Sequence, residues 1–218
     1  MRMPEFIDCT TAPETITGST QNLTVHELAN GLLATNASIA PKYFYNTLGS
    51  KLFEAITLLD EYYPTRTEAA IFEANYSSIA QAIKEAGINN VCLIDLGAGN
   101  CAKSAALIPH LKPQQYVPVD ISVDFLREAA GKLQASFPSL NIVGVGMDFS
   151  SALVLPDAVQ NHDRVFFYPG SSLGNFSPDD ALHFLQQIAS STQGNASGLL
   201  LGIDLVKDTA VLDRKSVV

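Results

Sequence analysis

The second half of the chain alternates short apolar runs with amphipathic stretches. From residue 91 onward, five runs of aliphatic and β-branched residues are each long enough for one strand, and apolar positions between them recur at helical spacing. This alternation predicts an α/β fold with a doubly wound parallel sheet. Ser177 is the expected N-cap of the last helix, which has Pro178 at its first position. The predicted strands are Val91–Leu96, Tyr116–Asp120, Asn141–Val145, Val165–Tyr168 and Leu199–Asp204, and the predicted helices are Ala102–Leu111, Val123–Phe137 and Pro178–Ser191.

The first 86 residues have a different pattern. Residues 1–36 are rich in Thr, Asn, Ser and Pro, with one weakly helical stretch, so we expect an extended or loosely packed arm. Residues 41–64 contain six aromatic side chains, too many for an ordinary linker. Thr65 and Glu68 match the S/T-x-x-E capping box, which predicts a helix from about Arg66 to a stop at Gly87. We therefore expect an N-terminal arm and substrate cap over residues 1–86 and a sheet domain over residues 87–218.

Composition and charge narrow the class of protein. A chain of 218 residues that is 47% hydrophobic can bury a sizeable core. Its net charge of -9 disfavours nucleic acids and anionic membranes as partners. No apolar run reaches the ~18 residues of a membrane span, and residues 1–20 lack the pattern of a secretory signal, so we expect a cytoplasmic protein. The cysteines Cys9, Cys92 and Cys101 are scattered and the histidines have no ligand spacing, so we expect packing residues and no metal.

The turn after the first predicted strand of the sheet is rich in glycine. Gly97, Gly99 and Ala102 satisfy G-x-G-x-x-G/A, and Asp120 lies 21 residues after Gly99 at the end of the next strand. A dinucleotide would use this turn and carboxylate, and so would S-adenosylmethionine (SAM), which brings no phosphate. A phosphate-binding loop is a third interpretation, because Lys103 and Ser104 follow the turn. A turn without a ligand is the fourth.

Geometry ranks these interpretations without deciding between them. The phosphate-loop pattern is missed at Ala102, where a Cβ risks strain of about 1 kcal/mol or more if a glycine-only conformation is required. Simple dinucleotide domains place this strand near the start of the chain, whereas here about 90 residues precede it. Asp120 at the end of the second predicted strand argues against a turn without a ligand.

Two later strand ends carry candidate binding residues. Asp148 and Phe149 offer an acceptor for an adenine amine and a ring that stacks on a base, although an Asx turn with a core phenylalanine fits the same residues. Asn175 follows the fourth strand, where open α/β sheets bind ligands. Its amide oxygen is suited to accept a hydrogen bond from a substrate amine, or it is only a turn residue.

Several motifs together resemble those of one family. They are Pro41-Lys42-Tyr43-Phe44-Tyr45, Gly49-Ser50-x-Leu52-Phe53-Glu54-x-Ile56-Thr57, Glu61-Tyr62-Tyr63-Pro64-Thr65-Arg66-Thr67-Glu68, Asp95-Leu96-Gly97-Ala98-Gly99, Pro118-Val119-Asp120, Asp148-Phe149, residues 169–178 and residues 201–208. The set is similar to the signature of the histidine-specific SAM-dependent methyltransferases, the family of the L-histidine Nα-methyltransferase of ergothioneine biosynthesis. The resemblance covers about residues 40–213.

This resemblance implies a class I SAM-methyltransferase fold, Rossmann-like, with an N-terminal helical and aromatic substrate cap. It implies SAM as cofactor, a small amino acid such as L-histidine as substrate, and a monomer when full length. Tyr62 and Asn175 become the catalytic and substrate-binding residues, and Tyr45 joins them in substrate binding. The implied cofactor-binding residues are Gly97, Gly99, Lys103, Asp120, Asp148 and Phe149, with Lys103 as the cation for the methionine carboxylate.

The chain departs from the family pattern near its C-terminus. The family continues after the fifth predicted strand with a helix that carries a substrate-contacting tyrosine, and later with glutamate and serine positions that recognise the imidazole. We find no counterpart here, and residues 214–218 do not follow the pattern, so we expect a truncated chain whose sheet is incomplete on that side. A SAM-binding fragment without histidine turnover is therefore an alternative to the active enzyme, and an NAD-dependent oxidoreductase is a third hypothesis.

Overall fold

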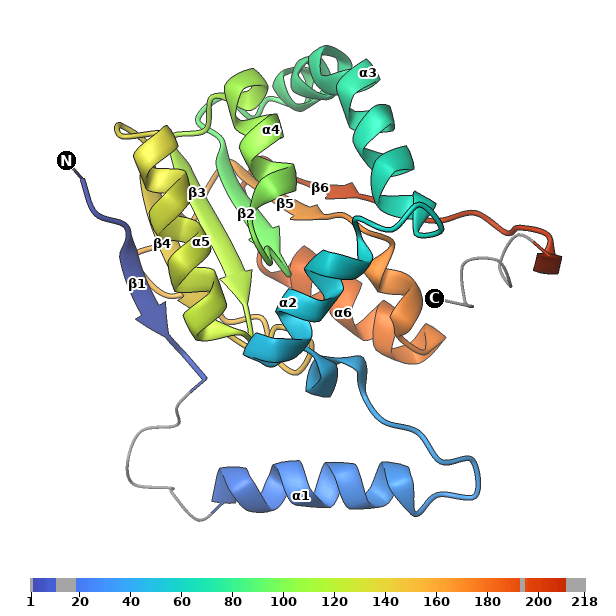
Figure 1. Cartoon of the computed structure of the whole chain (residues 1–218). Helices are drawn as coiled ribbons and strands as arrows, with labels where there is room; N and C mark the ends of the chain where they lie inside the picture. The colour runs from blue at the N-terminus through green and yellow to red at the C-terminus, as the bar shows by residue number, and fades with distance from the viewer. Residues whose placement is uncertain (1, 11–18, 193–194, 211–218) are drawn as a thin grey trace.

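The centre of the protein is a parallel sheet. The computed structural model describes residues 2–10, 19–192 and 195–210. In this part of the chain six strands form one sheet in the order β1-β4-β3-β2-β5-β6 (Figure 1). The chain builds β2, β3 and β4 outward in one direction and then returns to add β5 and β6 on the other side of β2, which is the predicted doubly wound topology. The strands are β1 (Glu5–Asp8), β2 (Cys92–Leu96), β3 (Gln115–Asp120), β4 (Asn141–Gly146), β5 (Arg164–Tyr168) and β6 (Ser197–Leu201).

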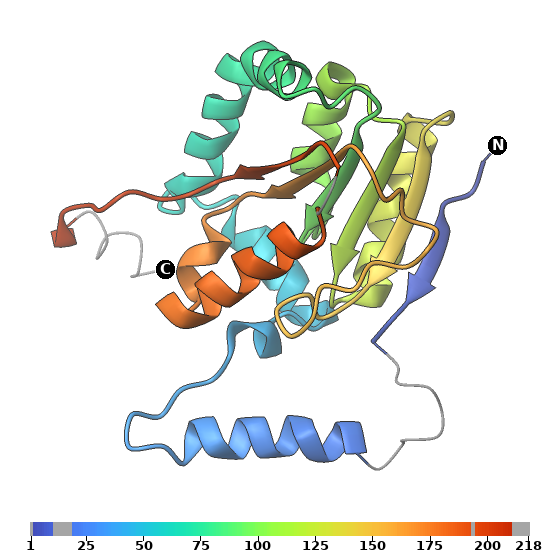
Figure 2. The same cartoon turned by 180° about the vertical axis from the view of Figure 1, so that it is seen from behind.

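Helices cover both faces of the sheet. One face carries α3 (Tyr63–Glu85), α4 (Ala102–Leu111) and α5 (Val123–Ser136), and the view from behind shows α6 (Pro178–Ser190) on the other face (Figure 2). Two apolar clusters result, because alternate residues of each buried strand point to opposite faces. The bounds of α4, α5 and α6 follow the predictions within one residue, and Ser177 caps α6 by accepting a hydrogen bond from the amide of Asp180.

The N-terminal arm contributes a strand that the sequence did not predict. The described residues form six strands instead of the five expected, because β1 pairs in parallel with β4 at the edge of the sheet. The ring of Phe6 lies in the space above Gly144, where a Cβ would come within 2.5 Å of the ring, and the guanidinium of Arg127 lies 4.3 Å from its centroid. A segment of four residues forms this strand through its contacts with β4 rather than through its own pattern.

The aromatic cap, residues 41–64, lies across the carboxyl ends of the central strands. It contains the 3-10 helix η2 (Pro41–Phe44), α2 (Thr47–Ile56) and the start of α3, and it follows α1 (Ser19–Leu32) in the chain (Figure 1). Asn46 caps α2 by accepting a hydrogen bond from the amide of Gly49 at 2.8 Å. No residue of α2 is fully buried. The cap therefore rests on the sheet domain without a core of its own.

The predicted capping box at Thr65–Glu68 is wrong. Helix α3 begins at Tyr63, with Pro64 in its first turn and no side-chain cap, so Thr65 already lies inside the helix. The carboxylate of Glu68 instead contacts Lys103 and the amide of Gly170. At the other end of the helix, Gly87 takes the left-handed conformation (φ +80°) expected of a stop.

Two of the cysteines are packing residues, as expected, and one is not. Cys92 and Cys101 are buried, and burial raises the pKa of each thiol to about 12, so both stay protonated at neutral pH. Cys9 is exposed. The expectation about residues 214–218 concerns residues outside the described ones. Among the described helices, none has the length and apolarity to cross a bilayer.

Candidate active site

The glycine turn lies between β2 and α4 and is bound to the neighbouring strand. Gly97 and Gly99 have φ of +72° and +52°, in the left-handed region that favours glycine. The amides of Gly97 and Ala98 both donate to the carbonyl of Val119, at 2.9 and 3.1 Å. The amide of Gly99 donates to Oδ2 of Asp120 at 2.9 Å. The turn is thereby held against the carboxyl end of β3.

Asp120 presents its carboxylate beside this turn. Its Oδ1 accepts a hydrogen bond from the amide of Ser122 at 2.9 Å, and Oδ2 accepts the bond from Gly99. Burial raises the pKa of Asp120, and the hydrogen bonds from these amides offset only part of that effect. Because a carboxylate offers about four lone-pair positions, each oxygen retains capacity for one further donor. Paired hydroxyls such as those of a ribose are donors of the required kind.

Asp95 is a buried acid below the turn that the sequence did not single out. It is the next-to-last residue of β2 and accepts hydrogen bonds from the hydroxyls of Ser104, at 2.5 Å, and Tyr116, at 2.8 Å. Burial raises its pKa to about 6, against the opposing effect of the two hydroxyls. A carboxylate inside an apolar strand run was the available signal, because a buried acid needs partners.

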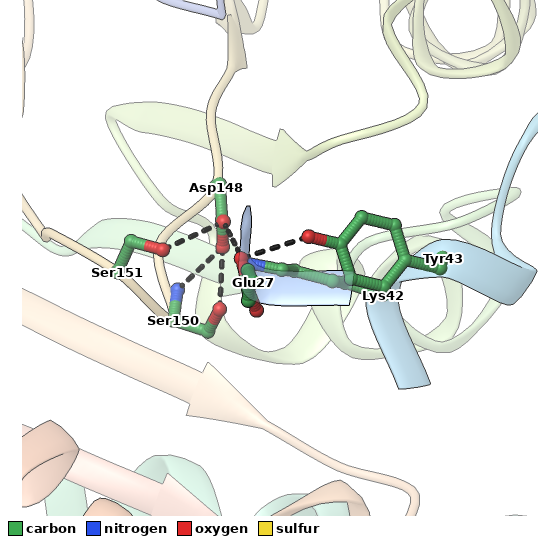
Figure 3. Close-up of polar contacts among 6 residues, drawn as sticks. All are labelled: Glu27, Lys42, Tyr43, Asp148, Ser150 and Ser151. Carbon is green, nitrogen blue, oxygen red and sulfur yellow. Dashed lines mark hydrogen bonds and ion pairs between the residues drawn. The ribbon is translucent and has the colours of Figure 1, made fainter. Parts of the chain in front are cut away.

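Asp148 is tied to the aromatic cap by a lysine. Its Oδ2 accepts from Nζ of Lys42 at 3.0 Å and from the hydroxyl of Ser151 at 2.7 Å, and its Oδ1 accepts from the amide of Ser150 at 3.1 Å (Figure 3). Lys42 also lies 3.1 Å from Glu27, which accepts a hydrogen bond from the hydroxyl of Tyr43. Burial alone would raise the pKa of Asp148, but these donors outweigh it and hold the pKa below its usual value. We call Glu27, Lys42, Tyr43 and Asp148 the lysine clasp.

Phe149 packs between the site and the core. Its ring lies edge-on to Tyr168 at 5.9 Å and is tilted against Phe184 at 5.8 Å. A Cβ on Gly97 would lie 3.7 Å from Phe149, so the ring also borders the glycine turn. Asp148 forms the Asx turn and Phe149 is partly buried, as expected if the two residues have only a structural role. The position of Phe149 beside Gly97 is also compatible with binding of an adenine ring.

Two tyrosines of the aromatic cap, Tyr45 and Tyr62, line the same cavity as the glycine turn. Tyr45, Phe53 and Tyr62 form a chain of edge-to-face contacts with centroid distances of 5.9 and 6.0 Å. Burial raises the pKa of Tyr45 and Tyr62, and the charge of Asp120 contributes to the shift at Tyr45. Both phenols are therefore protonated and neutral at pH 7.

Glu68 and Lys103 form an ion pair between the cap side and the turn. Nζ of Lys103 lies 2.6 Å from Oε2 of Glu68, and Oε1 of Glu68 accepts a hydrogen bond from the amide of Gly170 at 2.6 Å. This pairing replaces the capping box that the sequence predicted. Gly170 follows β5, and the 3-10 helix η3 (Ser172–Asn175) next to it carries Asn175.

The glycine turn, the strand ends beside it and the aromatic cap border one cavity of about 1600 Å³. Every candidate site residue predicted from the sequence lies in its wall: Tyr45, Tyr62, Gly97, Gly99, Lys103, Asp120, Asp148, Phe149 and Asn175. Sequence reasoning missed Lys42, Glu68 and Asp95 as members of the same wall. The structure thus brings the predicted residues together, while their individual roles stay predictions.

The charge of the cavity wall suits a cation better than a phosphate. The described lining includes the carboxylates of Glu27, Glu54, Glu68, Asp95, Asp120, Asp148, Asp180 and Asp204, against the ammonium groups of Lys42, Lys103 and Lys207. Lys42 and Lys103 are both paired with carboxylates. A pyrophosphate or triphosphate would meet this acidic wall without an unpaired lysine at the turn. A sulfonium ligand with an adenosine group is compatible with it.

Comparisons with known proteins agree with this geometry. The family described as histidine-specific methyltransferase, SAM-dependent, matches residues 24–214. Histidine N-alpha-methyltransferases of Mycobacterium tuberculosis and Mycolicibacterium smegmatis are 36% and 38% identical to this chain, over 86% and 84% of it and 57% and 56% of their own lengths. The 4-dimethylallyltryptophan N-methyltransferase easF of Claviceps purpurea is 26% identical, over 83% of this chain and 55% of its own. This chain thus spans about half the length of these curated relatives.

The solved structures show the fold independently. Magnesium protoporphyrin IX methyltransferase from Synechocystis PCC 6803, crystallised with bound SAM, has a TM-score of 0.52 at 17% identity, over 73% of this chain and 75% of its own. That likeness concerns the class I α/β fold alone. The family match covers most of the chain and decides among the ligand interpretations that the glycine turn left open. The chain belongs to the histidine-specific, SAM-dependent methyltransferase family, and SAM is the cofactor that this family uses.

Proposed function

We propose that this chain methylates the α-amine of L-histidine with SAM as the methyl donor. The observation that carries the proposal is the cavity whose wall contains the glycine turn, Asp120, Tyr45, Tyr62 and Asn175 together. Histidine is favoured over other amines because the two histidine-methylating relatives are 36% and 38% identical, whereas the dimethylallyltryptophan enzyme is 26% identical. A final product with three methyl groups is part of the proposal, since the family resemblance implies it.

The residues around the glycine turn would hold the cofactor. Asp120 would accept hydrogen bonds from the ribose hydroxyls with the two positions that Ser122 and Gly99 leave open. Phe149 would border the adenine ring. The exocyclic amine of adenine would compete with Lys42 for Asp148, whose oxygens already accept several donors. When bound, SAM supplies an electrophilic methyl group on a sulfonium, so the protein has to align the partners rather than activate the donor.

The substrate side of the cavity would orient a neutral amine. An α-amine with a pKa of about 8 is deprotonated in a usable fraction at pH 7, and its alignment accounts for much of the rate gain. Asn175 would accept a hydrogen bond from the amine and direct its lone pair. The neutral phenols of Tyr45 and Tyr62 would hold the substrate, and the aromatic cap would exclude water. No side chain is assigned as a strong general base.

A direct assay tests the proposal. The protein is incubated with SAM and one of three substrates, L-histidine, L-tryptophan or 4-dimethylallyltryptophan. The products are identified by mass spectrometry. Mono-, di- and trimethylhistidine with little or no modified tryptophan are the expected products. Methylation of the tryptophans alone would contradict histidine as the substrate but would agree with SAM-dependent N-methylation as the reaction.

The alternative function is SAM binding without turnover. The sequence motifs left this alternative open beside the active enzyme. Titration calorimetry separates the two cases. Heat from SAM with none from histidine, together with no methyl transfer, would support the binding-only alternative. Binding of NAD instead of SAM would support an oxidoreductase and contradict both.

A further inference from the structure

The ion pair between Glu68 and Lys103 is built into the cavity wall at a defined place. Oε1 of Glu68 is fixed by the amide of Gly170, and a Cβ on Gly202 would come within 2.3 Å of the same oxygen. Gly202 therefore leaves the space that the carboxylate fills. Oε2 is buried and lies 2.6 Å from Nζ of Lys103. The two atoms form an ion pair, and no described residue donates a hydrogen bond to Oε2. One oxygen is fixed, and the other is available for exchange of its cation.

The order of the strand ends places this pair at one end of the cavity. Asp148 follows β4, Asp120 ends β3, the glycine turn follows β2, and Gly170 follows β5. Since the sheet runs β4-β3-β2-β5, these groups lie in that order along its carboxyl edge. Glu68 and Lys103 lie between β2 and β5, where the strand order reverses. If Asp120 holds the ribose and the adenine lies toward Asp148, the amino-acid end of the ligand points to Glu68 and Lys103.

We propose that Glu68 and Lys103 together form a receptor for the zwitterionic amino-acid end of the cofactor, in which Glu68 binds the ammonium group and Lys103 binds the carboxylate. This inference rests on the proposed function and adds Glu68, a residue of α3, to the binding site. In the free protein the ammonium of Lys103 occupies the position at Oε2 that the ammonium of the ligand takes. Binding exchanges one cation for another at Glu68 and turns Lys103 toward the ligand carboxylate, so the charges stay paired.

The test separates the amine from the carboxylate with four ligands. Titration calorimetry measures S-adenosylhomocysteine, its analogue without the amine, its analogue without the carboxylate, and 5′-methylthioadenosine, which lacks both. Glu68→Gln keeps an oxygen for the amide of Gly170 and removes the charge. We expect this variant to bind the two amine-containing ligands about 10- to 100-fold more weakly, the range of a charge-assisted hydrogen bond. 5′-Methylthioadenosine should bind within about twofold of the wild type, and the analogue without the amine should bind no more weakly than to the wild type, because the variant has no buried charge that loses Lys103.

Lys103→Met provides the complementary measurement. It should weaken the two carboxylate-containing ligands and spare the analogue that keeps only the amine. The matched control is Glu128→Gln, which removes a carboxylate from an exposed ion pair with Lys132 at 2.7 Å. This control should change none of the four affinities. Thermal denaturation of each variant verifies that it is folded before its affinities are compared.

Three outcomes would overturn the receptor. If Glu68→Gln weakens the deaminated analogue as much as S-adenosylhomocysteine, Glu68 only positions Lys103. If the wild type binds S-adenosylhomocysteine no more tightly than 5′-methylthioadenosine, the amino-acid end is not recognised although the cofactor site stands. If none of the adenosyl ligands binds, the proposed function fails together with the receptor.

Discussion

The sheet and the aromatic cap are held in place by different forces. Every residue of β2 is buried, and the strands bury apolar side chains on both faces. The cap helix α2 has no fully buried residue, and polar bridges join the cap to the sheet domain, from Lys42 to Asp148 and from Glu54 to Asn100. Just beyond the cap, Glu68 of α3 pairs with Lys103. Partly exposed ion pairs contribute little to stability, whereas apolar burial dominates it. Global stability and access to the cavity are therefore governed by separate parts of the molecule.

The largest effect should follow a truncation in the sheet. Phe166 in β5 is 0% exposed, whereas Phe44 in the cap is 59% exposed. Phe166→Ala should reduce the free energy of unfolding by about 3–5 kcal/mol, because it opens a cavity in the core. Phe44→Ala should change it by less than about 1 kcal/mol. Urea denaturation measures both values, and a similar loss in the two variants would refute the comparison.

Asp95 should give the sheet a pH-dependent stability. Its pKa is raised to about 6 in the folded protein, so the folded state binds this proton more tightly than the unfolded chain does. The resulting stabilisation is complete below pH ~4 and is lost as the pH rises through 6, with a total of roughly 3 kcal/mol. Asp95→Asn keeps an acceptor for Ser104 and Tyr116 and should remove this dependence. The measurement is the difference in unfolding free energy between wild type and variant from pH 4 to 7, and a difference that stays constant would disprove it.

Asp120 lies at the end of a sheet strand, in the wall of the cavity that the aromatic cap also lines. Asp120→Asn leaves only one acceptor oxygen for the amides of Gly99 and Ser122, so the turn loses a hydrogen bond and the ribose loses a charged acceptor. Affinity for S-adenosylhomocysteine should fall about 10- to 100-fold by calorimetry. Asp124→Asn, on the first turn of α5, is the matched control and should retain the wild-type affinity.

The lysine clasp should have the smallest effect on stability and a local effect on the cap. Lys42→Met removes both ion pairs of this lysine, which is partly exposed, so unfolding free energy should fall by less than about 1 kcal/mol. Hydrogen exchange of the amides in α2 should become faster, while exchange in β2 should be unchanged. Equal acceleration in both elements would show that the cap and the sheet open together.

Sequence periodicity located the sheet domain, and tertiary contacts decided the remainder. The apolar strand runs and the helices α4 to α6 bury their patterned faces, so their own residues were sufficient to predict them. The bounds of the last strand were wrong, because β6 spans Ser197–Leu201 and not the expected Leu199–Asp204. Strand β1 has only four residues and depends on β4. The capping box failed because Pro64 starts α3 earlier and because Glu68 has partners in Lys103 and Gly170, the latter 102 positions away in sequence.

The same distinction applies to the site. Gly97, Gly99 and Asp120 lie in a local motif with characteristic spacing, which a single sequence reveals. Lys42 and Asp148 are 106 positions apart, and the sequence contains nothing that pairs them. Distant ion pairs of this kind arise only when separate elements pack together, so they are visible only in three dimensions.

Strand β1 has a consequence for how the clasp recovers after it opens. Residues 5–8 are hydrogen-bonded along β4, and Asp148 follows the end of that same strand. The segment that carries Glu27 and Lys42 is therefore anchored upstream to the strand that leads to its own binding partner. A released Lys42 stays tethered near Asp148, so reclosure is an intramolecular event with a high effective concentration. The chain also runs from Lys42 through α2 and α3 into β2, so the lysine is tethered to the sheet on both sides and recapture stays intramolecular.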